Sequence, residues 1–226
     1  MEEMLKRKRE SWGNLTDITS NKIKEMLNQD RTELTIPYIT IKGPFSKGTI
    51  KDNIEKATPD TMLAIEGLAV FQNQRLSYWL SSKDSNLYAL TKSKIHDTTL
   101  VTKCQKQSGY VTWKDVRSKP VIHLQDKEGV PSFLLQLQIT GKLSDVSCNL
   151  DTSTTKAIAT LEHDAEQDLQ KQINQLLVKT QNKKTDINGF GEVMYRKQPD
   201  RWNRVKNNWN SVYSTVQIQT NVRLDF

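Results

Sequence analysis

One segment, residues 153–183, restricts the fold more than any other part of the chain. Apolar side chains recur in it at steps of three and four residues: Ile158, Leu161, Ala165, Leu169, Ile173, Leu176 and Leu177. This spacing is typical of one long helix whose apolar stripe must be covered by another layer. The stripe is too irregular for a coiled coil, which needs sustained heptads. We therefore expect the helix to lie against a sheet, with Asp151 or Ser153 as its N-cap.

Short apolar or alternating runs, which are typical of strands, recur after residue 60. They cover residues 62–71, 75–80, 100–101, 110–117, 121–125, 133–140 and 212–224. Asn73-Gln74 is a hairpin turn between the first two runs, and Ser81 or Ser82 opens a short helix after the second. Strands followed by helices and a closing strand indicate an α+β fold. We expect an antiparallel or mixed sheet, covered by the long helix and by shorter C-terminal helices.

The first sixty residues predict less structure. Their expected elements are a charged helix over 1–10, a helix over 20–27, a strand over 34–41 and a linker with little core over 43–60. Pro37 cannot donate to a strand ladder, so it belongs at a sheet edge or a bulge. We therefore divide the chain into a partial N-terminal region, 1–60, and a C-terminal domain, 61–226.

Composition favours anionic partners. The formal net charge is +7, which suits nucleic acid, an anionic membrane surface or an acidic protein. No apolar run approaches the roughly 20 residues of a membrane-spanning helix. The basic run Lys6–Arg9 is followed by polar residues, so we expect neither an export signal nor a lipid-anchor cysteine within this chain.

No motif for catalysis or metal binding stands out. The sequence contains no G-x-S-x-G, no phosphate-binding P-loop and no H-x-x-x-H pair. We expect a protein that is not an enzyme, with no cofactor and no metal. Cys104 and Cys148 lie 44 residues apart, without metal-ligand spacing. Two buried thiols are the favoured interpretation, and a single disulfide is the alternative.

Residues 186–192, Asp-Ile-Asn-Gly-Phe-Gly-Glu, end the long helix. Gly-Phe-Gly lacks the preceding strand and third glycine of a dinucleotide loop, so we expect a structural corner. One glycine should adopt a positive φ, and Phe190 should enter the core. A second helix should span 193–197, and Pro199 should open a third. Basic residues beside Trp202 and Trp209 would suit single-stranded nucleic acid, but their helical spacing favours a core role.

This C-terminal stretch resembles the signature of the Ger(x)C family, the C subunits of bacterial spore germinant receptors. The positions that carry the resemblance are Asp186, Gly189, Phe190, Gly191, Glu192, Arg196, Lys197, Pro199, Trp202 and Trp209. Asn188 stands where the family pattern has an aromatic residue, and Tyr195 where it has His. Residues 67–71 and 146–151 also agree with the family. The resemblance covers about residues 60–226.

The resemblance implies a lipoprotein on the outer face of the spore inner membrane, where it acts with membrane A and B subunits in nutrient sensing. Its role would be receptor assembly or signal transmission, and the motif residues would be structural. No nucleic acid is expected as a partner, and the sequence indicates no site for a small-molecule germinant. A basic nucleic-acid-binding protein of α+β class is the alternative.

Overall fold

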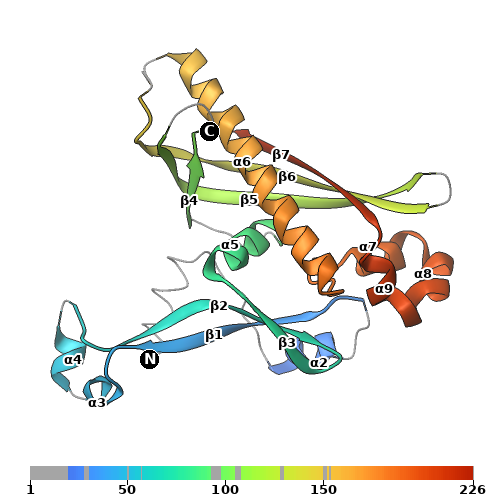
Figure 1. The fold of residues 1–226 in the computed structure, drawn as a ribbon, viewed down its shortest axis with the longest axis horizontal. Helices are drawn as coiled ribbons and strands as arrows, with labels where there is room; N and C mark the ends of the chain where they lie inside the picture. The colour runs from blue at the N-terminus through green and yellow to red at the C-terminus, as the bar shows by residue number, and fades with distance from the viewer. Residues whose placement is uncertain are drawn as a thin grey trace.

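Two β-sheets, with a helix between them, make up the fold (Figure 1). The computed structural model describes residues 20–27, 31–49, 51–56, 58–92, 98–104, 108–127, 130–149, 152 and 154–225. The expected helix over residues 1–10 lies outside these ranges. The architecture is α+β, as the sequence predicts.

The first sheet has the antiparallel order β1-β2-β3, and α2 (Ser20–Leu27) precedes it. Its strands are β1 (Leu34–Lys42), β2 (Met62–Gln72) and β3 (Arg75–Leu80). Pro37 lies in the edge strand β1, and the register shifts one pair later, at Tyr38 and Ile39. The position of Pro37 therefore satisfies both expectations. The division at residue 60 stays a prediction, but β1 and β2 pair with each other across it.

The second sheet is mixed, with the order β4-β5-β6-β7. Its strands are β4 (Thr98–Lys103), β5 (Tyr110–Lys127), β6 (Val130–Val146) and β7 (Gln217–Asp225). β7 runs parallel to β6, because the chain returns through helices before it rejoins the sheet. The two strands expected over 110–117 and 121–125 form one strand. Pro120 removes only one ladder donor, and Asp115 adopts a φ of 55° where the register shifts.

The long helix α6 (Thr155–Asn182) covers one face of the second sheet. Its stripe is buried, with Ile158 partly buried at the start, and the facing β6 side chains are also buried: Phe133, Leu135, Leu137 and Ile139. The N-cap is Thr154, whose Oγ1 accepts from the Ala157 N–H at 3.2 Å. The expected caps, Asp151 and Ser153, lie outside the described residues.

Helix α5 (Ser82–Thr91) contacts β2, β5 and α6, and so fills the space between the two sheets. Ser81 caps it by accepting from the Asp84 N–H at 3.2 Å. Because its side chains contact both sheets, the apolar residues form one continuous core. This continuity means that the two sheets are held together by packing as well as by hydrogen bonds.

The C-terminal helices differ from expectation. They are α7 (Phe190–Lys197), α8 (Pro199–Val205), the short 3₁₀ helix η1 (Lys206–Asn208) and α9 (Trp209–Tyr213). Helix α7 begins at Phe190, three residues before the expected start. The single helix expected after Pro199 is broken at residues 206–208 into separate pieces.

The linker expected over residues 43–60 contains two short helices, α3 (Phe45–Gly48) and α4 (Lys51–Glu55). Asn53 ties this segment to β2, because its Nδ2 donates to the Thr61 carbonyl at 2.8 Å and its Oδ1 accepts from the Thr61 N–H at 2.9 Å. Phe45 is 70% exposed, so the segment has little core of its own, as expected.

Cys104 and Cys148 form a disulfide. The favoured interpretation of two buried thiols is therefore wrong, and the alternative is right. The chain segments that carry the two cysteines meet after β4 and after β6. The Cys104 N–H donates to the Gly109 carbonyl at 3.2 Å, and Gly109 packs against the backbone of Cys148.

Candidate functional site

The corner between α6 and α7 gathers the residues that the sequence singled out. Gly189 is the N-cap residue of α7 and adopts the left-handed conformation, with φ 82°. A residue with a Cβ is strained there, so glycine is favoured. The positive φ expected for one of the two glycines falls on Gly189, and Phe190 enters the core with no exposed surface.

The Asp186 carboxylate accepts the hydrogen bonds that hold the corner together, and we call it the hub. Its Oδ1 accepts from the N–H groups of Gly189 at 2.8 Å and Phe190 at 3.1 Å. Its Oδ2 accepts from the Gly191 N–H at 2.7 Å and from Nε1 of Trp209 at 3.1 Å. The carboxylate thus caps the first turn of α7, where N–H groups lack helical partners. This capping is the physical reason why α7 begins at Phe190.

Burial dominates the electrostatics of Asp186. It raises the pKa of this carboxyl above its ordinary value, because the charged form loses its hydration. The four N–H donors act in the opposite direction. Burial likewise raises the pKa of Tyr213 well above 10, and the nearby Asp186 charge adds to that rise. The donors around the Asp186 carboxylate all belong to the corner, so the carboxylate is suited to stabilising the local fold.

Aromatic rings pack around the corner. Phe190 lies between Phe133 and Tyr213, with ring centroids 5.1 and 5.9 Å away. Trp202 and Trp209 meet edge to face at 5.4 Å and are 4% and 3% exposed. The core role expected for the two indoles is confirmed. Their rings are not available to stack on nucleic acid bases, which such binding requires.

Residue 191 must be glycine because neighbouring atoms leave no room for a larger side chain. A Cβ on this residue would lie 2.8 Å from the Arg31 carbonyl oxygen, 2.8 Å from Nε1 of Trp209 and 3.0 Å from the Trp202 ring. The φ of Gly191 is not in the left-handed region, so space alone excludes a larger side chain. The corner therefore needs glycine twice, for two different reasons.

The same corner holds the first sheet. The Asp186 carbonyl accepts from the Glu33 N–H at 2.9 Å and from Oγ1 of Thr32 at 3.1 Å, and both residues lie just before β1. The Lys184 carbonyl accepts from Nε2 of Gln72 at 2.8 Å, at the end of β2. The corner is therefore a joint between β1, β2 and the C-terminal helices.

Three further contacts reach β3 and the C-terminal end of α5. The Tyr78 and Thr185 hydroxyls are 2.8 Å apart. Asn188 donates from Nδ2 to Oγ1 of Thr91 at 2.7 Å, and its carbonyl accepts from Nζ of Lys92 at 3.1 Å. We call these contacts, together with those of Thr32, Glu33 and Gln72, the joint. The sequence did not predict which residues outside the corner contact it. No local pattern indicates a contact between residues more than 90 positions apart.

The remaining motif residues lie on the rim of the corner. Glu192 pairs with Arg31 at 3.1 Å and with Arg196 at 2.6 Å. The Arg31 guanidinium also lies 4.1 Å from the centre of the Tyr195 ring. Lys197 is exposed, and Pro199 begins α8. The structure thus brings Asp186, Gly189, Phe190, Gly191, Glu192, Trp202 and Trp209 together, and leaves Arg196, Lys197 and Pro199 at the outer edge.

The described residues contain neither a group that could hold a metal ion nor a helix that could span a membrane. In the part of the chain that the structure describes, no three His, Cys, Asp or Glu side chains lie close enough to hold a metal ion. No helix among the described residues is long and apolar enough to span a membrane.

Residues 66–225 match the family model described as "Spore germination B3/GerAC like, C-terminal". The chain belongs to this family. The Asp186 corner lies within the matched residues.

Three named proteins are similar to this chain. Spore germination protein KC of Bacillus subtilis is 25% identical over 89% of this chain and 50% of its own length. Spore germination protein YndF of the same organism is 30% identical over 48% of this chain and 26% of its own length. The chain thus spans half or less of these relatives. The crystal structure of the GerBC protein has the same fold, with a TM-score of 0.70, 17% identity, and coverage of 93% of this chain and 61% of that one.

Proposed function

We propose that this chain is a non-enzymatic subunit of a spore nutrient-germinant receptor, where it serves receptor assembly or signal transmission. The match of residues 66–225 to the germination family carries the proposal. The names of the relatives KC and YndF, both spore germination proteins, point the same way.

The geometry of the corner suggests how such a subunit would work. Most motif residues face inward, and the oxygens of Asp186 accept hydrogen bonds from the corner itself, from Trp209 and from Glu33 just before β1. A corner of this kind fixes the relative position of the two sheets. A partner bound to one sheet would then move the other with it, because packed and hydrogen-bonded elements shift as a unit.

The partners that we propose are the membrane A and B subunits, at the outer face of the spore inner membrane. The net charge of +7 suits an anionic headgroup surface. Arg196 and Lys197 are exposed residues of α7. This helix lies on the opposite side of the molecule from α3 and α4 (Figure 1). Charges at the rim of an interface mainly change association rate and salt dependence.

A genetic and biochemical experiment tests the proposal. Deletion of the gene in a sporulating host without redundant receptors should abolish nutrient germination. A tagged copy should restore germination and co-purify the A and B subunits. Normal germination of the deletion strain, with no subunit recovered on the tagged chain, would overturn the assignment.

Point variants sharpen this experiment. Lys197→Glu reverses an exposed charge at the rim of the corner, and Lys171→Glu makes the same change on the exposed side of α6. We expect the first to slow association with the receptor subunits and the second to leave it unchanged. Equal effects of the two variants would mean that net charge matters and the corner surface does not.

The nucleic-acid alternative gains no support from the structure. Its aromatic residues, Trp202 and Trp209, are buried against each other and against the corner. A salt series of DNA binding still provides a direct check, since phosphate contacts give a steep dependence on salt. We expect no specific binding.

A further inference from the structure

The strand β7 forms an edge of the second sheet to which no other described strand is paired. It pairs with β6 on one side only, and Figure 1 shows it at the margin of the sheet. Its nine residues include no proline and no glycine, and its pairing with β6 has no register shift. A long and regular edge of this kind is a template on which a further strand can pair.

The other sheet edges, β1, β3 and β4, are short or interrupted. β1 contains Pro37, with a register shift beside it. β3 has six residues and a register shift against β2. β4 also has six residues, and its Lys103 N–H donates to the Asp168 carboxylate of α6 at 3.0 Å. Prolines, irregularities, short strands and covering side chains are the features by which natural sheets prevent further pairing.

One hydrogen bond shows which backbone groups of β7 face outward. The Leu224 N–H donates at 3.0 Å to a carboxylate oxygen of Glu166, on α6, and not to β6. Backbone groups of successive residues point to alternate sides of a strand, so those of Ile218, Thr220 and Val222 face the same outer side. No hydrogen bond joins these backbone groups to another described residue. We call residues 218–222 the open edge, which ends where Glu166 covers Leu224.

There is room for a strand beside the open edge. Two adjoining grooves, of about 830 and 700 Å³, run between β7 and α6 and share Gln170, Asn174, Val178 and Asn221. Val178 is 54% exposed, so α6 presents an uncovered apolar side chain to both grooves. A strand paired with β7 would direct alternate side chains toward α6, where they would cover Val178.

We propose that the open edge pairs with β7 of a second copy of this chain, in antiparallel orientation around a two-fold axis at Thr220. About this axis residue 218 of one copy faces residue 222 of the other, and Thr220 faces itself. Each open N–H then meets a C=O of the same row, as an antiparallel ladder requires. The bond between Leu224 and Glu166 lies beyond the paired residues and stays in place.

The side chains next to the axis match those of a second copy. On the exposed face of β7, Gln219 of one copy would face Asn221 of the other. A carboxamide carries both donors and an acceptor, so these side chains are complementary to each other without any charge. Arg223 would face Gln217 of the other copy, so no like charges stand opposite each other in the paired stretch. A second copy is therefore a partner of suitable chemistry for this edge.

Association of the purified full chain tests the proposal. Sedimentation velocity over a concentration series should show a reversible equilibrium between monomer and dimer. Residue-resolved amide exchange then identifies the surface. The N–H groups of Ile218, Thr220 and Val222 should exchange more slowly as the dimer forms, because they gain partners. Those of Gln219 and Asn221 point to the β6 side and should not change.

Variants with altered charge test the register. Gln219→Lys combined with Asn221→Lys places like charges opposite each other on both sides of the axis, and should weaken dimerisation about 2-fold to 30-fold. Gln219→Glu combined with Asn221→Lys places opposite charges there, and should dimerise at least as well as the parent. Both positions are exposed, so the fold should be retained.

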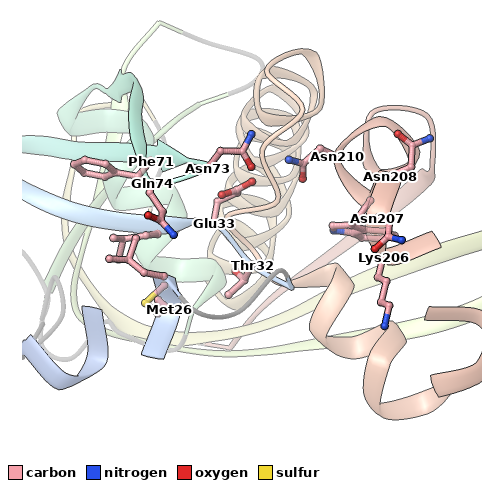
Figure 2. A pocket seen from close by; sticks show the side chains of 13 residues that line it. Met26, Thr32, Glu33, Phe71, Asn73, Gln74, Lys206, Asn207, Asn208 and Asn210 are labelled. Carbon is pink, nitrogen blue, oxygen red and sulfur yellow. The ribbon is translucent and has the colours of Figure 1, made fainter. Parts of the chain in front are cut away.

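A matched control adds the same charge elsewhere. Asn203 and Asn207 are exposed residues of α8 and η1, and Figure 2 shows Asn207 among the C-terminal helices. Neither residue lines the grooves beside β7. Asn203→Lys combined with Asn207→Lys should therefore dimerise like the parent.

Three results would overturn the proposal: a chain that stays monomeric at every concentration, a dimer that leaves the exchange of the open edge unchanged, or equal weakening by the β7 variant with two lysines and by its control. The first result would leave the open edge to a strand of another protein or to solvent. The proposal goes beyond the proposed function and does not depend on it, because neither measurement requires receptor subunits. A chain that dimerises through β7 but recovers no receptor subunit would refute the receptor role alone.

Discussion

Replacing Asp186 by Asn tests whether the carboxylate holds the corner together. The substitution keeps the shape of the side chain but turns one of its two oxygens into a donor group. Each oxygen accepts two N–H groups, so whichever way the amide turns, two buried donors lose their acceptor. A buried donor left unpaired costs about 1–3 kcal/mol, and two cost roughly 2–6 kcal/mol.

Part of this loss is recovered. The variant no longer buries a charge, and that burial is unfavourable enough to raise the pKa of Asp186. We therefore expect a net loss of about 2–4 kcal/mol in the free energy of unfolding. In a chain of this length that corresponds to a fall of roughly 5–15 °C in the unfolding temperature.

Urea unfolding followed by tryptophan fluorescence measures this loss. Asp145→Asn is the matched control, because Asp145 is exposed on β6. The control should unfold like the parent chain. If Asp186→Asn also stays within about 0.5 kcal/mol of the parent, the size of an ordinary surface effect, then the carboxylate does not hold the corner and the capping argument is wrong.

The pH dependence gives an independent check on the same residue. Because the folded pKa is raised above the unfolded value of about 3.9, ionisation of Asp186 opposes folding. Its contribution is most favourable below the unfolded pKa and is lost as pH rises through the folded pKa. Asp186→Asn removes this dependence, so the stability gap between the parent and the variant should widen as pH falls toward 4. A gap that narrows on acidification would contradict the direction of the shift.

Three other perturbations have clear expected outcomes. Leu169→Asp places an unpaired charge in the core under α6, which costs several kcal/mol and should unfold the C-terminal domain, whereas the exposed Gln175→Asp should melt like the parent. Gly191→Ala forces a Cβ to within 2.8 Å of a backbone oxygen and an indole nitrogen, and should cost about 1–3 kcal/mol in urea unfolding. Replacing Cys104 and Cys148 together by Ser opens a 44-residue loop and should cost about 2–4 kcal/mol, and intact mass after alkylation without reductant should show no free thiol in the parent.

The sequence was sufficient where a single local pattern decides the outcome. The stripe from Leu161 to Leu177 predicts α6 and its buried face, since a periodicity of three and four residues is a property of the helix itself. Gly-Phe-Gly predicts a corner because glycine is favoured at a positive φ such as that of Gly189. The burial of Trp202 and Trp209 was also predicted, although the single helix on which that prediction rested is broken between them at residues 206–208.

Features that join distant parts of the chain could not be predicted from such local patterns. The pairing of Cys104 with Cys148 depends on two segments that lie far apart in the sequence and that the second sheet brings together. The parallel alignment of β7 depends on the path of the whole C-terminal segment. Pro120 and Asp115 read as interruptions in the sequence, but the long partner strand β6 pairs on both sides of them and keeps β5 continuous.

The candidate site likewise has one part that the sequence predicts and another that it does not. Its inner half is local, because Asp186 caps the helix that begins four residues later. Its outer half joins residues 154 positions apart, at Thr32 and Asp186. Nothing near Thr32 in the sequence indicates a partner in the germination motif, so only the folded chain identifies the corner as a joint.

Neither departure from the family pattern falls on the hub: Asn188 belongs to the joint, and Tyr195 lies on the rim of the corner. Asn188 uses its side chain to bond α5, and its carbonyl accepts from Lys92. Tyr195 lies under the Arg31 guanidinium, immediately before β1. Neither side chain touches the Asp186 carboxylate, whose donors are three backbone N–H groups and one indole. The corner can therefore stay intact while substitutions at these two positions change how firmly the first sheet is held. The side chains that keep the corner folded are therefore separate from those that hold the first sheet against it.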